Sequence, residues 1–155
     1  MKDLKYFMRE RKEEIVKAMG PESFKDDEGN VIEFEIKKLS FEEIDHILEG
    51  YKDHRIATDK KGNPIITGGN EVAWKTNNDS KRATRHIIAE ALVYPNLKDK
   101  KMMEYYNCHD ITDMPLKVFP NADEYTHVVK IVMAALGLGE FESEKDEKTI
   151  EEAKN

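Results

Sequence analysis

The sequence predicts an α+β fold, mostly helical, because two kinds of hydrophobic periodicity occur along it. Apolar and charged residues alternate from Ile32 to Lys37, which is the period of two expected of a half-buried strand. Apolar residues recur at helical spacing over residues 41–51 and again over residues 122–136. We therefore expect one domain over residues 1–139, in which one or two β-hairpins pack on a helical core.

The chain of 155 residues is acidic and rich in charged side chains. Charged residues make up 37% of it and its formal net charge is −7, which disfavours nucleic acid and anionic membranes as general partners. The single cysteine, Cys108, excludes an intrachain disulfide. The first ten residues lack the apolar region of a signal peptide, and no apolar run approaches the roughly 18 residues of a membrane span. These features predict a cytoplasmic protein.

The first element is expected to be a helix over residues 3–18, ended by Gly20 and Pro21. Its apolar residues lie roughly on one face: Leu4, Phe7, Met8, Ile15 and Ala18. The charged run at 9–14 interrupts this face, so we expect this helix to be broken or to lie at the periphery.

A β-hairpin is predicted over residues 22–39. Residues 26–30 form its turn, because Gly29 and Asn30 tolerate the positive φ that hairpin turns need. A helix should follow at Ser40, which forms a capping box with Glu43. The next segment, residues 52–78, is the least regular and suggests a second, smaller hairpin or a mobile flap.

Further helices are expected over residues 80–93, 99–106, 112–119 and 122–136. Pro95 ends the first of them, because the residue before a proline avoids helical backbone angles. The last helix has Asn121 as its N-cap, Glu124 in the capping-box position and Gly137 just past its end. Residues 140–155 are nearly all polar, which predicts a flexible, disordered acidic tail.

The chain contains few residues in patterns typical of catalytic or metal-binding sites. Cys108, His109 and Asp110 are potential ligands, but three adjacent residues cannot usually all face one ion. A polar connection between two short helices explains them better. None of the H-E-x-x-H, G-x-S-x-G or P-loop patterns is present. We therefore expect no catalytic residues, no metal site, no cofactor and no enzymatic activity.

A basic and aromatic group of residues permits a nucleic-acid interpretation. It comprises Lys75, Lys81, Arg82, Arg85 and His86, with Trp74 nearby. This is the right type of surface for a nucleic acid. A solvated helix face in an acidic protein explains the same residues more simply, so nucleic acid is not the partner that we expect.

Methionine and tyrosine are concentrated in one short predicted helix, which carries Met102, Met103, Tyr105 and Tyr106. Methionine-rich surfaces adapt to varied apolar partners. The alternative, that these side chains fill the core, stays open for each of them. Trp74 could likewise be a lid over the core or an exposed anchor for a partner.

The order of several short motifs resembles the XkdN-like tail assembly chaperones of Gram-positive phages and prophages. The sequence F-K-D-D-E-G at 24–29 is followed by E-I-K at 35–37 and an acidic helix start at 40–43. Later come V-Y-P-N-L at 93–97, a short helix with a tyrosine-containing turn, and a helix that follows Pro120 and contains Tyr125. The chain closes in E-E-A-K-N at 151–155. The resemblance covers nearly the whole chain and is weakest over residues 52–78.

The resemblance implies a protein that handles other proteins without catalysis. Such chaperones bind the phage tape measure protein and keep it soluble while the tail tube assembles, and they are absent from the finished virion. A tail tube subunit is a further candidate partner, and self-association stays open. The residues expected to contact the client are Trp74, Tyr94, Met102, Met103, Tyr105 and Tyr106. A structural tail component and a nucleic-acid-associated protein are the alternatives.

Overall fold

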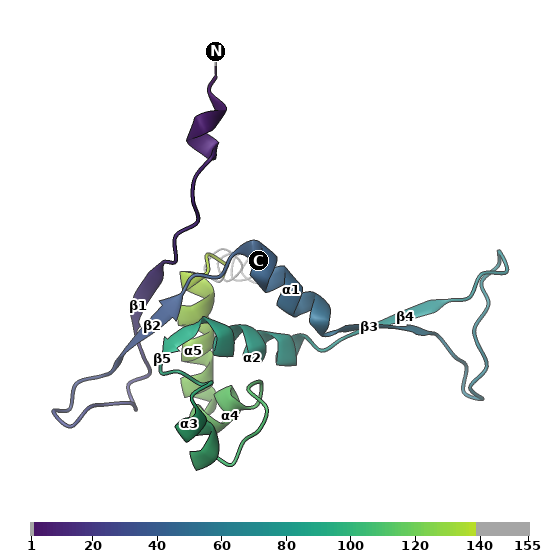
Figure 1. The fold of residues 1–155 in the computed structure, drawn as a ribbon. Coiled ribbons are helices and arrows are strands. Elements are labelled where there is room, and N and C mark those ends of the chain that lie inside the picture. Colours follow the sequence, from purple (N-terminus) through teal and green to yellow (C-terminus); the bar gives the residue numbers. More distant parts are fainter. Residues whose placement is uncertain (1, 139–155) are drawn as a thin grey trace, which may run out of the picture.

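The computed structural model describes residues 2–138 and shows five α-helices and two antiparallel sheets in that range (Figure 1). The helices are the short 3-10 helix η1 (Leu4–Phe7) and α1 (Phe41–Gly50), α2 (Ser80–Ala91), α3 (Lys100–Tyr105), α4 (Met114–Val118) and α5 (Ala122–Ala135). The strands are β1 (Ile15–Met19), β2 (Glu33–Lys37), β3 (Lys52–Ile56), β4 (Trp74–Asn78) and β5 (Leu92–Tyr94).

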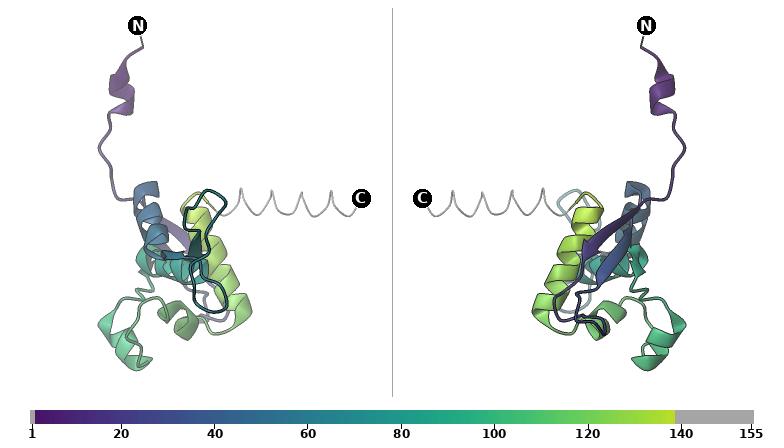
Figure 2. Two further views of the ribbon diagram at one scale, coloured as in Figure 1. Left: turned by 90° about the vertical axis from the view of Figure 1, so that its right-hand side faces the viewer. Right: turned by 90° about the vertical axis from the view of Figure 1, so that its left-hand side faces the viewer.

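The main sheet has the strand order β1-β2-β5 and is antiparallel throughout. Strand β2 lies in its centre and buries Phe34 and Ile36, while the alternate residues of the strand are more exposed. This is the alternation that the sequence predicted, and it gives the sheet one apolar face. Helix α5 packs against β2 and helix α2 against β5, so these helices cover that face (Figure 2).

The core lies between this face and the helices. Its largest fully buried side chains are Phe34, Phe119, Ile36, Ile88, Leu97, Met114, Val128 and Val132. Phe119 contacts both aromatic neighbours: its ring centroid is 5.6 Å from that of Phe24 and 5.9 Å from that of Phe34. The turn before α5 is thereby packed against the β1–β2 connection.

The predicted helix over residues 3–18 is wrong. Only Leu4–Phe7 are helical, residues 8–14 form no helix or strand, and residues 15–19 form β1. The charged run at 9–14 offers no apolar face for a helix to bury. Residues 15–19 can also be read with a period of two, because Val16 and Ala18 pack against the core between more exposed neighbours. Pairing with β2 decides between the two interpretations.

The predicted helix over residues 80–93 is two residues too long. It ends at Ala91, and the following residues form the edge strand β5, which pairs Glu35 with Tyr94 and Ile36 with Leu92. A mostly helical fold is therefore not confirmed: the described residues form a mixed α/β fold. The predicted hairpin turn is confirmed, since Asp26 accepts hydrogen bonds from the backbone N–H groups of Glu28 and Asn30.

The other predicted helices are present near their expected bounds. At α1, Ser40 and Glu43 form the predicted capping box, with bonds of 3.1 Å and 2.9 Å. Gly137 follows α5 with a φ of 79°, a left-handed conformation that suits glycine. Asn121 makes no side-chain cap; instead it donates a hydrogen bond to the buried Glu124, which also accepts one from Ser23.

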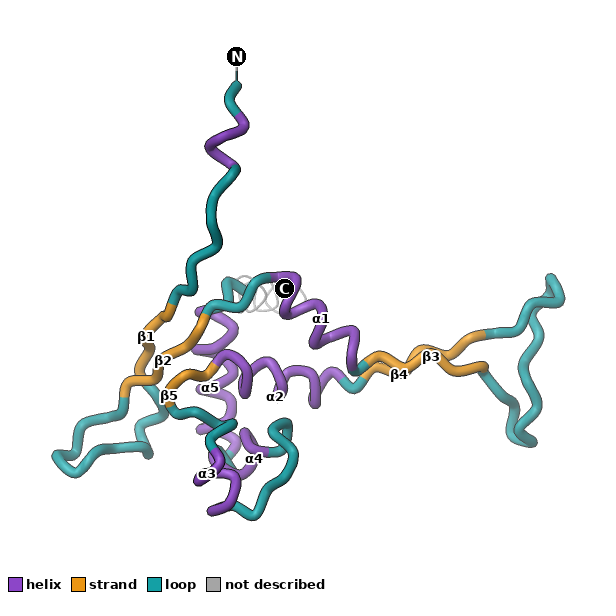
Figure 3. The backbone as a smooth tube through the Cα atoms, in the orientation of Figure 1, coloured by secondary structure: helices purple, strands orange, loops and turns teal. Residues whose placement is uncertain are grey.

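Three segments project from this body: the N-terminal arm (residues 2–14), the β1–β2 connection and the β3–β4 hairpin (Figure 3). The hairpin confirms the predicted second hairpin within residues 52–78, and the isolated bridges Thr58↔Pro64 and Ile66↔Val72 close two separate loops at its tip. The predicted mobility of this segment stays a prediction. The predicted acidic tail at 140–155 lies outside the described residues. Among residues 2–138, no helix is long and apolar enough to cross a membrane.

Candidate protein-binding surfaces

The methionines and tyrosines of α3 divide between the core and the surface. Met102, Met103 and Tyr106 are partly buried and pack against the hydrophobic core. Tyr105 is 81% exposed, and its ring makes an edge contact with the ring of Tyr106. Core filling therefore accounts for much of this cluster, and Tyr105 is its one member fully available to a partner.

The other two predicted contact residues lie on strands. Tyr94 is 49% exposed on β5, the edge of the main sheet. Trp74 is 66% exposed on β4, in the hairpin that extends away from the helices (Figure 1). The structure thus does not bring the six predicted residues together on one surface, because Trp74 lies on the hairpin, away from α3.

Trp74 belongs instead to a group of exposed apolar side chains on the hairpin. We call this group the hairpin patch; it comprises Ile56, Ile65, Ile66, Val72 and Trp74, all at least 38% exposed. Ile56 and Trp74 are direct cross-strand partners. Residues 52–78 also contain five Lys or Arg against three Asp or Glu, in a chain of net charge −7. The hairpin is thus a basic and apolar projection from an acidic protein.

The N-terminal arm, residues 2–14, exposes a second apolar group. Leu4, Tyr6, Phe7 and Met8 are 67–82% exposed, and no residue of η1 is buried. Arg11 fixes the base of the arm through two hydrogen bonds to the Glu43 carboxylate on α1, at 3.2 Å and 2.8 Å. The sequence pattern predicts Leu4, Phe7 and Met8 on one apolar face of a broken or peripheral helix, and the structure leaves all three exposed. The charged run that separates them from Ile15 was the signal that they are not part of the core.

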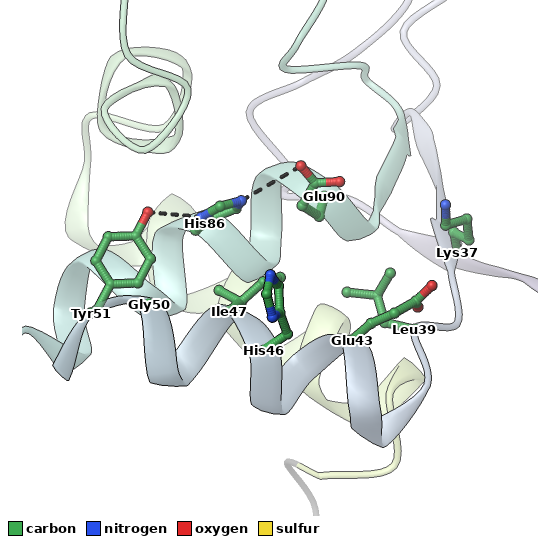
Figure 4. Close-up of a pocket in the computed structure, with 9 residues that line it drawn as sticks. All are labelled: Lys37, Leu39, Glu43, His46, Ile47, Gly50, Tyr51, His86 and Glu90. Carbon is green, nitrogen blue, oxygen red and sulfur yellow. Dashed lines mark hydrogen bonds and ion pairs between the residues drawn. The ribbon is translucent and has the colours of Figure 1, made fainter.

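A groove of about 550 Å³ lies between α1 and α2 (Figure 4). Its apolar lining comes from Leu39, Ile47 and Tyr51, and its polar lining from Lys37, Glu43, His46, His86 and Glu90. The Tyr51 hydroxyl is 2.7 Å from Nδ1 of His86, whose Nε2 is 3.6 Å from the Glu90 carboxylate. Burial raises the pKa of the Tyr51 hydroxyl. The groove is a mainly apolar depression with one hydrogen-bonded edge.

The two arginines of α2 are engaged within the protein. Arg82 pairs with both Asp79 and Asp110, at 3.6 Å and 3.1 Å. Arg85 donates a 2.8 Å hydrogen bond from Nε to the Thr112 carbonyl oxygen. These side chains join α2 to the connection between α3 and α4, which reduces their availability for phosphate groups.

Cys108, His109 and Asp110 lie in that same connection and point to different surroundings. Cys108 is buried and its thiol donates to the Asp110 carbonyl oxygen, whereas His109 is exposed. The Asp110 carboxylate accepts hydrogen bonds from the hydroxyl and the backbone N–H of Thr112, which lower the pKa of this carboxyl group. Among residues 2–138, no three His, Cys, Asp or Glu side chains are placed to hold a metal ion.

Comparison with known proteins assigns this arrangement to a family. A family model described as "Phage XkdN-like tail assembly chaperone protein, TAC" matches residues 4–154. The chain belongs to the XkdN-like tail assembly chaperone family. The resemblance predicted from residues 24–43 and 93–97 is thereby confirmed, and the segment 52–78 is included in the match.

Two relatives of this XkdN-like chain come from Bacillus subtilis (strain 168). The protein YqbN is 31% identical over 127 residues, which cover 81% of this chain and 77% of YqbN. The phage-like element PBSX protein XkdN is 27% identical over 155 residues, which cover 99% of this chain and 94% of XkdN. A crystal structure of YqbN has a TM-score of 0.66 at 24% identity, over 89% of this chain and 98% of that structure. The fold described above is therefore also that of a solved structure.

Proposed function

We propose that this chain is a non-enzymatic tail assembly chaperone that binds the phage tape measure protein in the host cytoplasm. It would keep this client soluble while the tail tube assembles around it, and would be absent from the mature virion. Membership of the XkdN-like family supports the assembly role. The hairpin patch is the observation that carries the binding role, because exposed apolar side chains that project from a charged body mark a protein interaction site.

The hairpin patch combines the properties that an aggregation-prone client requires. Its isoleucines, valine and tryptophan can cover apolar side chains of the client, and tryptophan is among the residue types enriched at the energetic centres of interfaces. The acidic body, of net charge −7 over the whole chain, would repel other copies of the complex and keep it dissolved. Tyr94 and Tyr105 remain candidate contacts outside the hairpin.

Co-expression with the tape measure protein of the same prophage tests the proposal. We expect the tape measure protein to move from the insoluble to the soluble fraction and to co-purify with this chain. Trp74→Ala should reduce the captured amount at least tenfold. Leu116→Ala is the matched control, since Leu116 is also an exposed apolar residue, 45% exposed on α4 outside the patch. A tape measure protein that stays insoluble beside a folded chaperone would contradict the proposal.

The alternative of a nucleic-acid-associated protein loses support at α2, whereas Trp74 and Lys75 are exposed on the hairpin. Two of its five basic candidates, Arg82 and Arg85, are engaged in contacts with Asp79, Asp110 and Thr112. Retention on DNA that falls steeply with salt would favour it, because binding to phosphates releases counterions. Detection of the chain in purified phage-like particles would favour the other alternative, a structural tail component.

A further inference from the structure

The N-terminal arm presents apolar side chains that its own body does not cover. Leu4 and Phe7 are 67% and 82% exposed, and the side-chain contacts between arm and body are ion pairs. The pairs are Arg11–Glu43, Lys37–Glu13 and Lys38–Glu14. These pairs hold residues 11–14 only, so the apolar segment 4–8 lies beyond the ion-paired part of the arm (Figures 1 and 2). Contiguous exposed apolar side chains of this kind indicate an interaction site.

The groove between α1 and α2 has matching properties. Its volume of about 550 Å³ lies within the range of roughly 300–1,000 Å³ typical of pockets that bind ligands. Its charged lining comprises Glu43 and Glu90 against Lys37, and helix α1, which forms one wall, carries no Lys or Arg along its length. Residues 2–9 of the arm carry Lys2, Lys5 and Arg9 against Asp3 alone. The arm thus carries a basic, apolar segment, and the same chain forms a mainly apolar groove in which carboxylates outnumber lysine.

We infer that this groove binds the apolar segment 4–8 of a second copy of the chain, so that two copies exchange their N-terminal arms. The base of each arm is already at the groove, because Glu43 both lines the groove and binds Arg11. The four Cα-to-Cα steps from Phe7 to Arg11 span at most about 14 Å when extended. The two bodies would therefore lie close together, and a reciprocal exchange closes as a twofold dimer.

A second copy fits the groove better than the chain's own arm does. With Arg11 held on Glu43, the own segment would have to reverse direction within Met8, Arg9 and Glu10. None of these residues is of the types that favour tight turns, namely Gly, Pro, Asn, Asp and Ser. The arm instead leads away from α1 and α2 in every view (Figures 1 and 2). The second copy meets no such restriction. The inference does not depend on the proposed client.

Sedimentation of the full chain without any client provides the first test. We expect a dimer at micromolar concentration, and Phe7→Asp should weaken its association at least tenfold, because a charge would enter an apolar groove. Phe41→Asp is the matched control: Phe41 is 73% exposed on α1 but does not line the groove, and this variant should stay dimeric. Both residues are exposed, so circular dichroism should show that both variants fold.

Disulfide trapping identifies the occupant of the groove. A Phe7→Cys copy is mixed with an isotope-labelled His46→Cys copy, since His46 is exposed and lines the groove. A 7–46 disulfide between a labelled and an unlabelled copy supports the exchange. As the control, a Phe41→Cys copy mixed with the same His46→Cys copy should form no disulfide. A monomer at all concentrations, or a dimer unchanged by Phe7→Asp, overturns it. A 7–46 disulfide within a monomeric double variant also overturns it, because the chain's own arm would then occupy the groove.

Discussion

At the scale of single residues, Gly20 shows how closely the β1–β2 connection packs on the core. A Cβ at this position would lie 2.5 Å and 2.8 Å from two ring carbons of Phe34, which is closer than atoms can approach. Phe34 is itself 2% exposed and packs on Phe119, so its ring has no space into which to move. Gly20 is therefore required for lack of space and not for a special backbone angle.

Gly20→Ala should accordingly destabilise the protein by about 1–3 kcal/mol, the usual cost of overpacking a core. Urea unfolding followed by circular dichroism measures this loss. Gly68→Ala is the control, because nothing lies within 4 Å of the position of its Cβ. Equal stabilities of the two variants would contradict the packing argument.

Asp110 makes the connection between α3 and α4 sensitive to pH. Hydrogen bonds from Thr112 lower the pKa of its carboxyl group below the value of the unfolded chain. The stabilisation by Asp110 is therefore complete above the unfolded pKa, ~4 for aspartate, and is lost as the pH falls through the lowered, folded pKa.

Asp110→Ala should lower the melting temperature by roughly 5 °C at pH 7, because Thr112, which is 3% exposed, loses its hydrogen-bond partner. The difference from the unsubstituted chain should shrink below the folded pKa. Melting curves across acidic pH measure it. A difference that does not change with pH would show that the carboxylate charge is not involved.

At the scale of elements, the start of α1 depends on a local sequence signal. Ser40 accepts a hydrogen bond from the backbone N–H of Glu43, and the Glu43 side chain accepts one from the backbone N–H of Ser40. Two N–H groups that the helix leaves unpaired are thereby satisfied. The same Glu43 binds Arg11, so the cap also positions the base of the N-terminal arm.

Ser40→Ala should cost about 1 kcal/mol of stability, as loss of an N-cap usually does. Ser80→Ala is the matched control, because Ser80 begins α2 but the side chain of Asp79 caps that helix. The free energy of unfolding in urea measures both variants. A similar loss in both would show that the serine hydroxyl of α1 has no special role.

At the scale of the whole molecule, the body and the projecting hairpin are energetically separate. Every residue of β4 is exposed, and β3 has its extensive contacts with β4 alone. The core cluster contains no residue of the hairpin. The stability of the body therefore does not require the hairpin patch.

Replacing residues 57–73 by Asn-Gly, which joins Ile56 to Trp74 through a tight turn, should change the free energy of unfolding by less than about 0.5 kcal/mol. The variant should nevertheless lose most of its capture of the tape measure protein. Urea unfolding and co-purification measure the two effects separately. Unfolding of the body in this variant would contradict the separation.

The local signals that the sequence predicted correctly act over a few residues. The capping box of Ser40, the turn at 26–30 and the glycine after α5 each depend on neighbours in the chain, and the structure contains all three. The alternation of β2 and the stripe of α5 also follow from local periodicity. The family resemblance likewise needed only the order of motifs along the chain.

Packing between residues far apart in the chain decided the features that local patterns do not predict. Residues 15–19 and 92–94 are compatible with helix by local pattern, and pairing with β2 made both of them strands. The exposure of apolar side chains also depends on residues far apart in the chain. Met102 and Met103 are partly buried because they pack against the core, whereas Phe7 and Trp74 are exposed because their segments project from the body. The sequence by itself thus determined the family and most helices. Only the tertiary structure decided which apolar side chains are free to bind a partner, since burial depends on contacts between residues far apart in the chain.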